Sequence, residues 1–171
     1  MVQCYIYPHK WFDDIMEQNG WNDRNIPDNS AFISICCLPE IRRGYLEAVK
    51  HETDEHWFKE NHGNVLNIDF DDILEEKAET EYGIAYGMSD EDASRIIKFI
   101  DSNREKQNWY MHCRSGKSRS VATGMFLKKY LKERYGIDVR VRSPVYGVMG
   151  MNGYMFGKYC KAAGLKDDKV Y

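Results

Sequence analysis

The stretch "MHCRSGKSRS" (residues 111–120) joins the end of one predicted element to the start of the next. Before it, "NWYMHC" (108–113) is an apolar run of the length of a short strand. After it, "SRSVATGMFLKKYLKERYG" (118–136) reads as a helix, with basic residues late and Gly136 as its stop signal. A short loop between a strand and a helix is typical of α/β folds built on a largely parallel sheet.

The rest of the chain continues this alternation. The pattern predicts strands at 2–7, 30–38 and 64–70, an edge strand around 140–143, and helices at 9–19, within 39–58 and at 151–164. Ser89 and Asp92 form a capping signal for a further helix, whose apolar face comprises Ala93, Ile96, Ile97 and Ile100. The acidic segment 71–83 is expected to be a loop. We therefore predict one domain over residues 1–171, with a central mixed, largely parallel sheet flanked by helices.

Composition limits the classes of protein to be considered. No apolar run approaches the ~20 residues that span a membrane, and the N-terminal residues lack a signal-peptide pattern. The five cysteines are an odd number without the spacing of a disulfide framework. We expect a cytoplasmic protein in a reducing compartment, without a membrane partner.

The net charge of −3 hides an uneven distribution. Residues 1–113 contain 11 Lys and Arg against 23 Asp and Glu, whereas residues 114–171 contain 13 against 4. The sign changes within the opening stretch. A dipolar surface on a soluble protein explains this simply, but a local positive field that attracts anions also fits.

The residue types in the loop suit attack on phosphorus. Cys113 can act as a nucleophile only as a thiolate, which a helix N-terminus and nearby cations favour. Arg119 offers a planar fork for two phosphate oxygens, and Ser120 can donate a hydrogen bond to the sulfur. His112 is placed to order the loop from behind. Together they describe an anion cradle with a thiolate at its floor.

The residues between Cys113 and Arg119 would line that cradle. Gly116 allows a sharp turn and close approach to a ligand. The backbone N–H groups of the loop can then form an anion-binding nest. The candidate phosphate-binding residues are Arg114, Ser115, Gly116, Lys117, Ser118 and Arg119.

Simpler interpretations apply to each motif. A single cysteine at a strand end is usually a small core residue. A nucleotide-binding loop would need glycine at 111, where Met111 stands, and a His-Glu-x-x-His zinc motif would need histidine where Glu55 stands. We therefore interpret "HETDEH" (51–56) as a charged surface segment, and Cys4, Cys36, Cys37 and Cys160 as core residues.

The stretch "HCRSGKSRS" resembles the signature loop of the cysteine-dependent protein tyrosine and dual-specificity phosphatases. The resemblance extends over roughly residues 30–135, through "FISI", "NVLNIDFDDI" and "DEDASRIIKFID", and is greatest with compact dual-specificity enzymes of phage and bacterial type. It implies that Cys113 is the nucleophile, Arg119 the phosphate clamp, Ser120 an aid to thiolate release and His112 a support for the loop. Val121 departs from the Gly or Pro of many relatives, a difference at the helix start.

The resemblance also implies a general acid on a loop after an upstream strand. Here "NVLNIDF" is followed by Asp71 and Asp72, and aligning "FDD" with the family pattern favours Asp72. Asp71 is the alternative, and Asp69 ranks third. Glu81 has the commoner spacing from the cysteine but no preceding strand. All of these carboxylates could equally be solvated loop residues.

Three functions follow from these features. The first is a phosphatase acting on phosphotyrosine in proteins, with phosphoserine and phosphothreonine as further candidate substrates, through a cysteinyl-phosphate and without cofactor or metal. The second acts on polyanions such as phosphoinositides, inositol polyphosphates or RNA 5′-phosphates, because Arg114 and Lys117 add positive charge. The third is a non-catalytic phosphate-binding module, which the presence of both Cys113 and Arg119 disfavours. We expect the first, as a monomer whose partner is a phosphorylated protein or another phosphomonoester, with nucleic acid the less favoured ligand.

Overall fold

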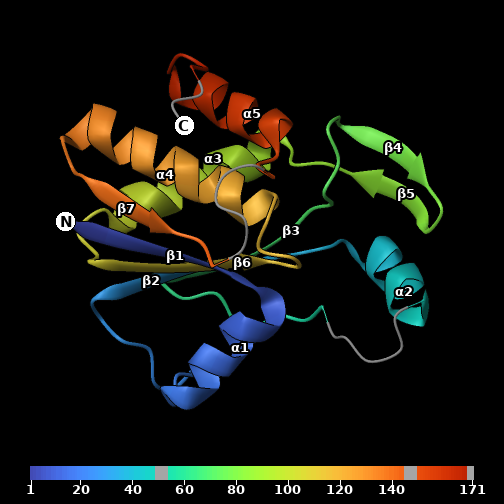
Figure 1. The fold of residues 1–171 in the computed structure, drawn as a ribbon, viewed down its shortest axis with the longest axis horizontal. Helices are drawn as coiled ribbons and strands as arrows, with labels where there is room; N and C mark the ends of the chain where they lie inside the picture. Colours follow the sequence, from blue (N-terminus) through green and yellow to red (C-terminus); the bar gives the residue numbers. More distant parts are fainter. Residues whose placement is uncertain (49–53, 145–149, 169–171) are drawn as a thin grey trace.

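The computed structural model describes residues 1–48, 54–144 and 150–168. Its centre is a sheet of five strands in the order β3-β2-β6-β1-β7, in which every neighbouring pair is parallel (Figure 1). The strands are β1 (Val2–Pro8), β2 (Ser30–Cys36), β3 (Val65–Asp69), β6 (Asn108–Cys113) and β7 (Val139–Arg142). The α/β prediction is confirmed. The central sheet is parallel rather than mixed, and β7 lies at its edge as expected.

Helices cover both faces of this sheet (Figure 1). They are α1 (His9–Gln18), α2 (Pro39–Ala48), α3 (Asp90–Asn103), α4 (Arg119–Tyr135) and α5 (Gly153–Ala163). Helix α1 lies on one face, while α3, α4 and α5 lie on the other. Successive residues of a strand point to opposite faces, so Phe32 packs with Phe12 of α1, while Ile33 packs in the core beneath α3 and α4.

The ends of α3 and α4 lie where the capping residues in the sequence predicted them. Ser89 and Asp92 form a reciprocal capping box at the start of α3, with both hydrogen bonds 3.0 Å long. Gly136 ends α4 in the left-handed conformation, as predicted, and Ala93, Ile96 and Ile100 are buried on the inner face of α3.

The prediction of an acidic loop over residues 71–83 is partly wrong. This segment contains an antiparallel hairpin of β4 (Lys77–Thr80) and β5 (Gly83–Tyr86) that pairs with itself and stands apart from the central sheet (Figure 1). The turn is held by Thr80, whose hydroxyl donates to Gly83 O at 2.8 Å and accepts from the Tyr82 amide at 3.2 Å. Its strands are only four residues long, and β4 carries Lys77 and Glu79, so the sequence showed no clear strand pattern there.

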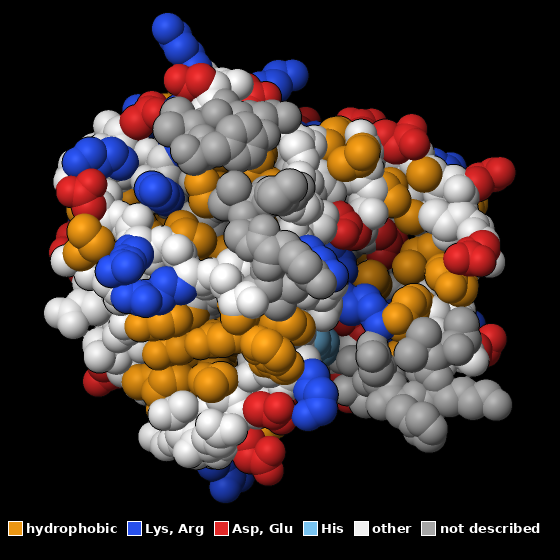
Figure 2. Space-filling model, viewed as in Figure 1, with side chains coloured by type: hydrophobic (Ala, Val, Ile, Leu, Met, Phe, Trp, Pro, Cys, Tyr) orange, Lys and Arg blue, Asp and Glu red, His pale blue; other side chains and the backbone are white. Residues whose placement is uncertain are grey.

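One face of the molecule carries a hydrophobic patch (Figure 2). Hydrophobic side chains gather in a patch below the sheet, beside α1, with Lys and Arg side chains above it (Figure 2). Among the described residues, no helix combines the length and the apolar character needed to cross a bilayer.

Candidate active site

The opening stretch forms the predicted strand, loop and helix. Strand β6 ends at Cys113, residues 114–118 bend, and α4 begins at Arg119. Gly116 has φ +67°, and a Cβ there would lie 2.5 Å from Pro8 N and 2.7 Å from Tyr7 C. The sequence analysis expected glycine here for close approach to a ligand. The sharp turn is confirmed by the positive φ, and Gly116 also approaches the backbone between β1 and α1, so the loop is packed against the first strand.

The Cys113 sulfur lies at the N-terminus of α4. Its nearest hydroxyl is Ser120 Oγ at 3.1 Å, and backbone N–H groups of Ser118 and Ser120 also face it. Burial raises the pKa of the Cys113 thiol, but the charge of Arg119 and these hydrogen bonds more than offset burial, so the pKa falls below its usual value. The position therefore favours a thiolate.

The other four cysteines provide a contrast within the same chain. Burial raises the pKa of Cys4, Cys36 and Cys37, and it raises the pKa of Cys160 to about 11. Cys4, Cys36 and Cys160 are core residues as predicted, whereas Cys37 is partly exposed and its sulfur lies 3.6 Å from Arg119 Nη1. Cys113 is thus the one cysteine of the five whose surroundings favour the anion.

Arg119, whose charge acts on the Cys113 sulfur, is fixed through Nη1 of its guanidinium. Its Nη1 donates to Phe70 O at 2.8 Å, at the carboxyl end of β3, and the side chain is buried. The Nε–H has no hydrogen-bond partner among the described residues. A buried guanidinium with an unpaired donor is suited to an anionic ligand, since such a group is costly to leave unsatisfied.

The two candidate acids have different environments. Asp72 is exposed, and its Oδ1 accepts from Ser118 Oγ at 2.7 Å and from Asn152 Nδ2 at 2.8 Å, which places it beside the loop. Asp71 is buried, and its oxygens accept from the backbone amides of Leu38 and Tyr86 at 3.0 and 2.9 Å. Burial raises the pKa of Asp71, as a proton donor requires, but both its oxygens are engaged in holding the backbone. Geometry therefore favours Asp72.

A cleft of about 540 Å³ opens over the loop between α2 and the β4–β5 hairpin. Its apolar and aromatic wall includes Ile41, Tyr45, Ile73, Tyr82 and Ala85. Its other lining residues are Cys37, Asp71, Asp72, Glu79, Thr80, Glu81, Arg114, Ser115 and Arg119. Thus the base is cationic, the side walls are aromatic and the rim is acidic.

The remaining predicted residues fall into two groups. Arg114 contacts Tyr45, with its guanidinium over the ring and a hydrogen bond to the hydroxyl, so it forms part of the wall. Ser115 lies exposed in the cleft, and Lys117 is exposed on the same loop. Glu81 stands on the cleft rim, whereas Asp69 is bonded to His56 and does not line the cleft.

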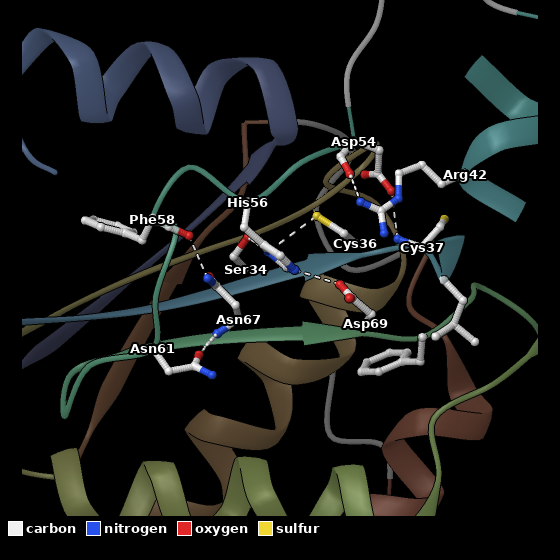
Figure 3. A network of polar contacts seen from close by, with 12 residues as sticks. Ser34, Cys36, Cys37, Arg42, Asp54, His56, Phe58, Asn61, Asn67 and Asp69 are labelled. Carbon is white, nitrogen blue, oxygen red and sulfur yellow. Dashed lines mark hydrogen bonds and ion pairs between the residues drawn. The ribbon is translucent and has the colours of Figure 1, made fainter. Parts of the chain in front are cut away.

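A second group of polar residues lies behind the loop (Figure 3). His56 Nε2 is 2.6 Å from Asp69 Oδ1, and His56 Nδ1 is 2.6 Å from Ser34 Oγ. The same hydroxyl lies 2.6 Å from Nε2 of His112, whose Nδ1 faces the Cys113 carbonyl at 3.4 Å. His112 thus supports the loop from behind, as the sequence suggested.

Part of the segment read as charged surface belongs to this group. Residues 51–53 lie outside the described residues, but Asp54 is buried and His56 is half-buried. Asp54 Oδ2 accepts from the Cys37 amide at 2.7 Å, and Arg42 donates to Asp54 O at 3.2 Å. The surface interpretation is therefore wrong for these two residues, because both are turned toward the end of β2.

Two groups of side chains in this region bring potential metal ligands together. The ligating atoms of Cys36, His56 and Asp69 lie within 4.8 Å of one another, as do those of His9, Cys36 and His112. However, Asp69 and Ser34 occupy opposite ring nitrogens of His56 at hydrogen-bond distance, and His112 is bonded on both sides. This is the arrangement of a hydrogen-bonded chain, not of side chains converging on one ion.

Sequence reasoning missed several of these residues. Tyr45, His56 and Asn152 reach the site from α2, from the loop after it and from the start of α5. Asn152 alone carried a usable signal, because an asparagine before a helix is a typical N-cap, and its Oδ1 accepts from the Met155 amide at 3.0 Å.

Compared with family models, curated proteins and solved structures, the sequence matches none of them.

Proposed function

We propose that this protein is a cysteine-dependent phosphatase that hydrolyses phosphomonoesters, with phosphotyrosine in proteins as its preferred substrate. The observation that carries the proposal is the environment of Cys113. Its pKa is lowered by Arg119 and by hydrogen bonds from the start of α4, while Arg119 Nε has no hydrogen-bond partner within the described part of the chain. A stabilised thiolate and an anion clamp at one point suit nucleophilic attack on a phosphate ester.

The reaction divides into two steps. The Cys113 thiolate attacks phosphorus while the P–O bond to the leaving group breaks, and Arg119 with the loop amides holds the non-bridging oxygens. Protonated Asp72 gives its proton to the leaving oxygen. Water then attacks the cysteinyl-phosphate, with the Asp72 carboxylate taking its proton, and the S–P bond breaks. Ser120 donates to the departing sulfur.

The walls of the cleft support an aryl phosphate rather than a polyanion. Tyr45 and Tyr82 meet edge to face with ring centroids 5.8 Å apart, and they can contact a phenyl ring. Glu79 and Glu81 stand on the rim, where further phosphate groups would meet like charge. Arg114, which suggested polyanions in the sequence, is engaged with Tyr45.

The experiment is hydrolysis of p-nitrophenyl phosphate in the presence of EDTA, followed by a panel of phosphotyrosine peptides, phosphoserine peptides, phosphoinositides and 5′-triphosphorylated RNA. We expect turnover that vanadate inhibits and that Cys113→Ser abolishes, with highest kcat/KM on phosphotyrosine peptides. Undiminished turnover by Cys113→Ser would refute the nucleophile. Preference for phosphoinositides or RNA would refute the substrate class while leaving the chemistry intact.

A further inference from the structure

The polar group behind the loop forms a continuous path from the surface to the nucleophile. It runs from Asp69 at the end of β3 through His56 and Ser34 to His112 and the Cys113 carbonyl. Its three side-chain contacts are each 2.6 Å long, and Figure 3 shows Asp69, His56 and Ser34 turned toward one another. Ser34 and His112 are buried, so no substrate reaches this Ser-His-Asp arrangement directly.

Counting donors and acceptors gives the path a direction. The Cys113 carbonyl can only accept, so Nδ1 of His112 carries its proton. Burial lowers the pKa of His112 well below its usual range, which keeps the ring neutral and leaves Nε2 as an acceptor. The Ser34 hydroxyl must therefore donate to His112, and its oxygen accepts from Nδ1–H of His56. Ionised Asp69 accepts from Nε2–H of the same ring.

We propose that Asp69, His56 and Ser34 are positioning residues that fix the tautomer of His112 and, through it, the peptide unit at the base of the phosphate loop. Because that peptide is planar and trans, a Cys113 carbonyl held by His112 directs the Arg114 N–H the opposite way. Donation from both ring nitrogens of His56, to Asp69 and to Ser34, holds the path in this direction. The proposal rests on the proposed function only in naming Cys113 as the nucleophile.

Other titratable groups surround this path. His9 stacks on His112 with ring centroids 4.2 Å apart, and Cys36 Sγ lies 3.5 Å from His56 Nδ1. The remaining charged groups near it are Asp54, 3.4 Å from His9; Lys59, whose Nζ donates to His56 O at 3.0 Å; and Arg42 and Arg119 beyond Cys36. His9, which lies 3.5 Å from Asp13, is a neighbour of the path rather than a member.

The first measurement is the tautomer of each histidine, read from ring ¹⁵N chemical shifts across pH. We expect His112 to carry its proton on Nδ1, and we expect both ring nitrogens of His56 to report donated hydrogen bonds. In Ser34→Ala the two rings should become independent, whereas Ser34→Thr, which keeps the hydroxyl, should restore the native shifts. A His112 protonated on Nε2 in the native protein would overturn the proposal.

The second measurement is the pH dependence of Cys113 alkylation by iodoacetamide, followed by peptide mass spectrometry. If the peptide unit after Cys113 turns and the thiolate loses one hydrogen bond of average strength, the pKa of Cys113 rises by about 0.7 unit. We expect a rise of that size in Ser34→Ala and a rise in the same direction in Asp69→Asn. His62→Gln is the matched control, since His62 pairs with Asp23 at 2.8 Å and takes no part in the path.

These readouts separate the two proposals. Both follow the rings and the sulfur rather than turnover, so they report even if no phosphate ester is hydrolysed. An unchanged Cys113 profile in folded Ser34→Ala and Asp69→Asn would overturn the positioning role. So would stoichiometric zinc in the purified protein that His56→Gln removes, because Cys36, His56 and Asp69 would then serve a metal.

Discussion

Replacing Ser120 with alanine is the sharpest perturbation of the nucleophile that the structure offers. Ser120 is fully buried, and its hydroxyl lies 3.1 Å from Cys113 Sγ. A hydrogen bond to a charged group contributes about 1.5–3 kcal/mol, which corresponds to a rise of about 1–2 units in the pKa of Cys113. The Arg119 charge and the Ser118 and Ser120 amides remain in the variant, so the pKa should rise but not reach that of the buried cysteines.

The same hydrogen bond should appear a second time in the kinetics. In the proposed mechanism the hydroxyl stabilises the sulfur as it leaves the cysteinyl-phosphate, so the second step should slow by about 10- to 150-fold for the same energy. Rapid mixing with p-nitrophenyl phosphate should then give a burst of p-nitrophenol followed by slow turnover. The pKa itself is measured by alkylation of Cys113 across pH. Ser120→Thr keeps the hydroxyl and is the control.

Two results would refute this reasoning. One is an unchanged Cys113 pKa in a Ser120→Ala protein whose circular dichroism and melting temperature match the native chain. The other is an equal shift in Ser120→Thr, which would assign the effect to packing within α4 rather than to the hydroxyl.

Three further predictions follow from the site. Asp72→Asn should slow hydrolysis about 10²- to 10⁴-fold, most for poor leaving groups. Asp71→Asn should instead lower the free energy of unfolding by about 1–3 kcal/mol, because one of the two backbone amides that donate to the carboxylate loses its acceptor. A leaving-group dependence in Asp71→Asn would reverse the assignment. Gly116→Ala should lower the free energy of unfolding, measured by urea titration, by about 3 kcal/mol or more. Gly136→Ala is the control, because Gly136 has the same φ of +67° but nothing within 4 Å, and it should cost about 1 kcal/mol. Equal costs would contradict the packing of Gly116 against Pro8. Asp54 is buried, yet the contact with His9, the hydrogen bond from the Cys37 amide and the charge of Arg119 lower its pKa to about 2. A lowered pKa stabilises the fold above the unfolded value, so about 2 kcal/mol should be lost as pH falls from about 4 to 2; urea midpoints in Asp54→Asn should lack this loss, and an identical pH profile in the variant would exclude it.

The sequence was most informative where local chemistry and position coincide. The loop between Cys113 and Arg119 could be placed because its flanking strand and helix have distinct periods and because Gly136 and the Ser89 cap mark helix ends. Asp72 lies beside this loop, where its carboxylate accepts a hydrogen bond from Ser118, and its role as the acid stays a prediction.

What could not be predicted depends on contacts distant in sequence. Ser34 and His112 are 78 residues apart and meet only because β2 and β6 are neighbours in the sheet. His56 lies in a segment so charged that it resembled surface, yet it folds back onto the end of β2. The close packing of Gly116 against Pro8 likewise could not be predicted, because the two residues are more than 100 positions apart in the sequence.

The β4–β5 hairpin pairs with itself, and its base is tied down by Asp71, whose carboxylate and backbone amide bond the backbone of Tyr86. One wall of the cleft is therefore a self-contained module that can be exchanged without breaking a ladder of the main sheet. A library of grafted hairpins between residues 76 and 87 would alter the shape and charge of the entrance while the reacting groups stay fixed. The hairpin is for that reason the part of the cleft that can be redesigned independently of the loop after β6.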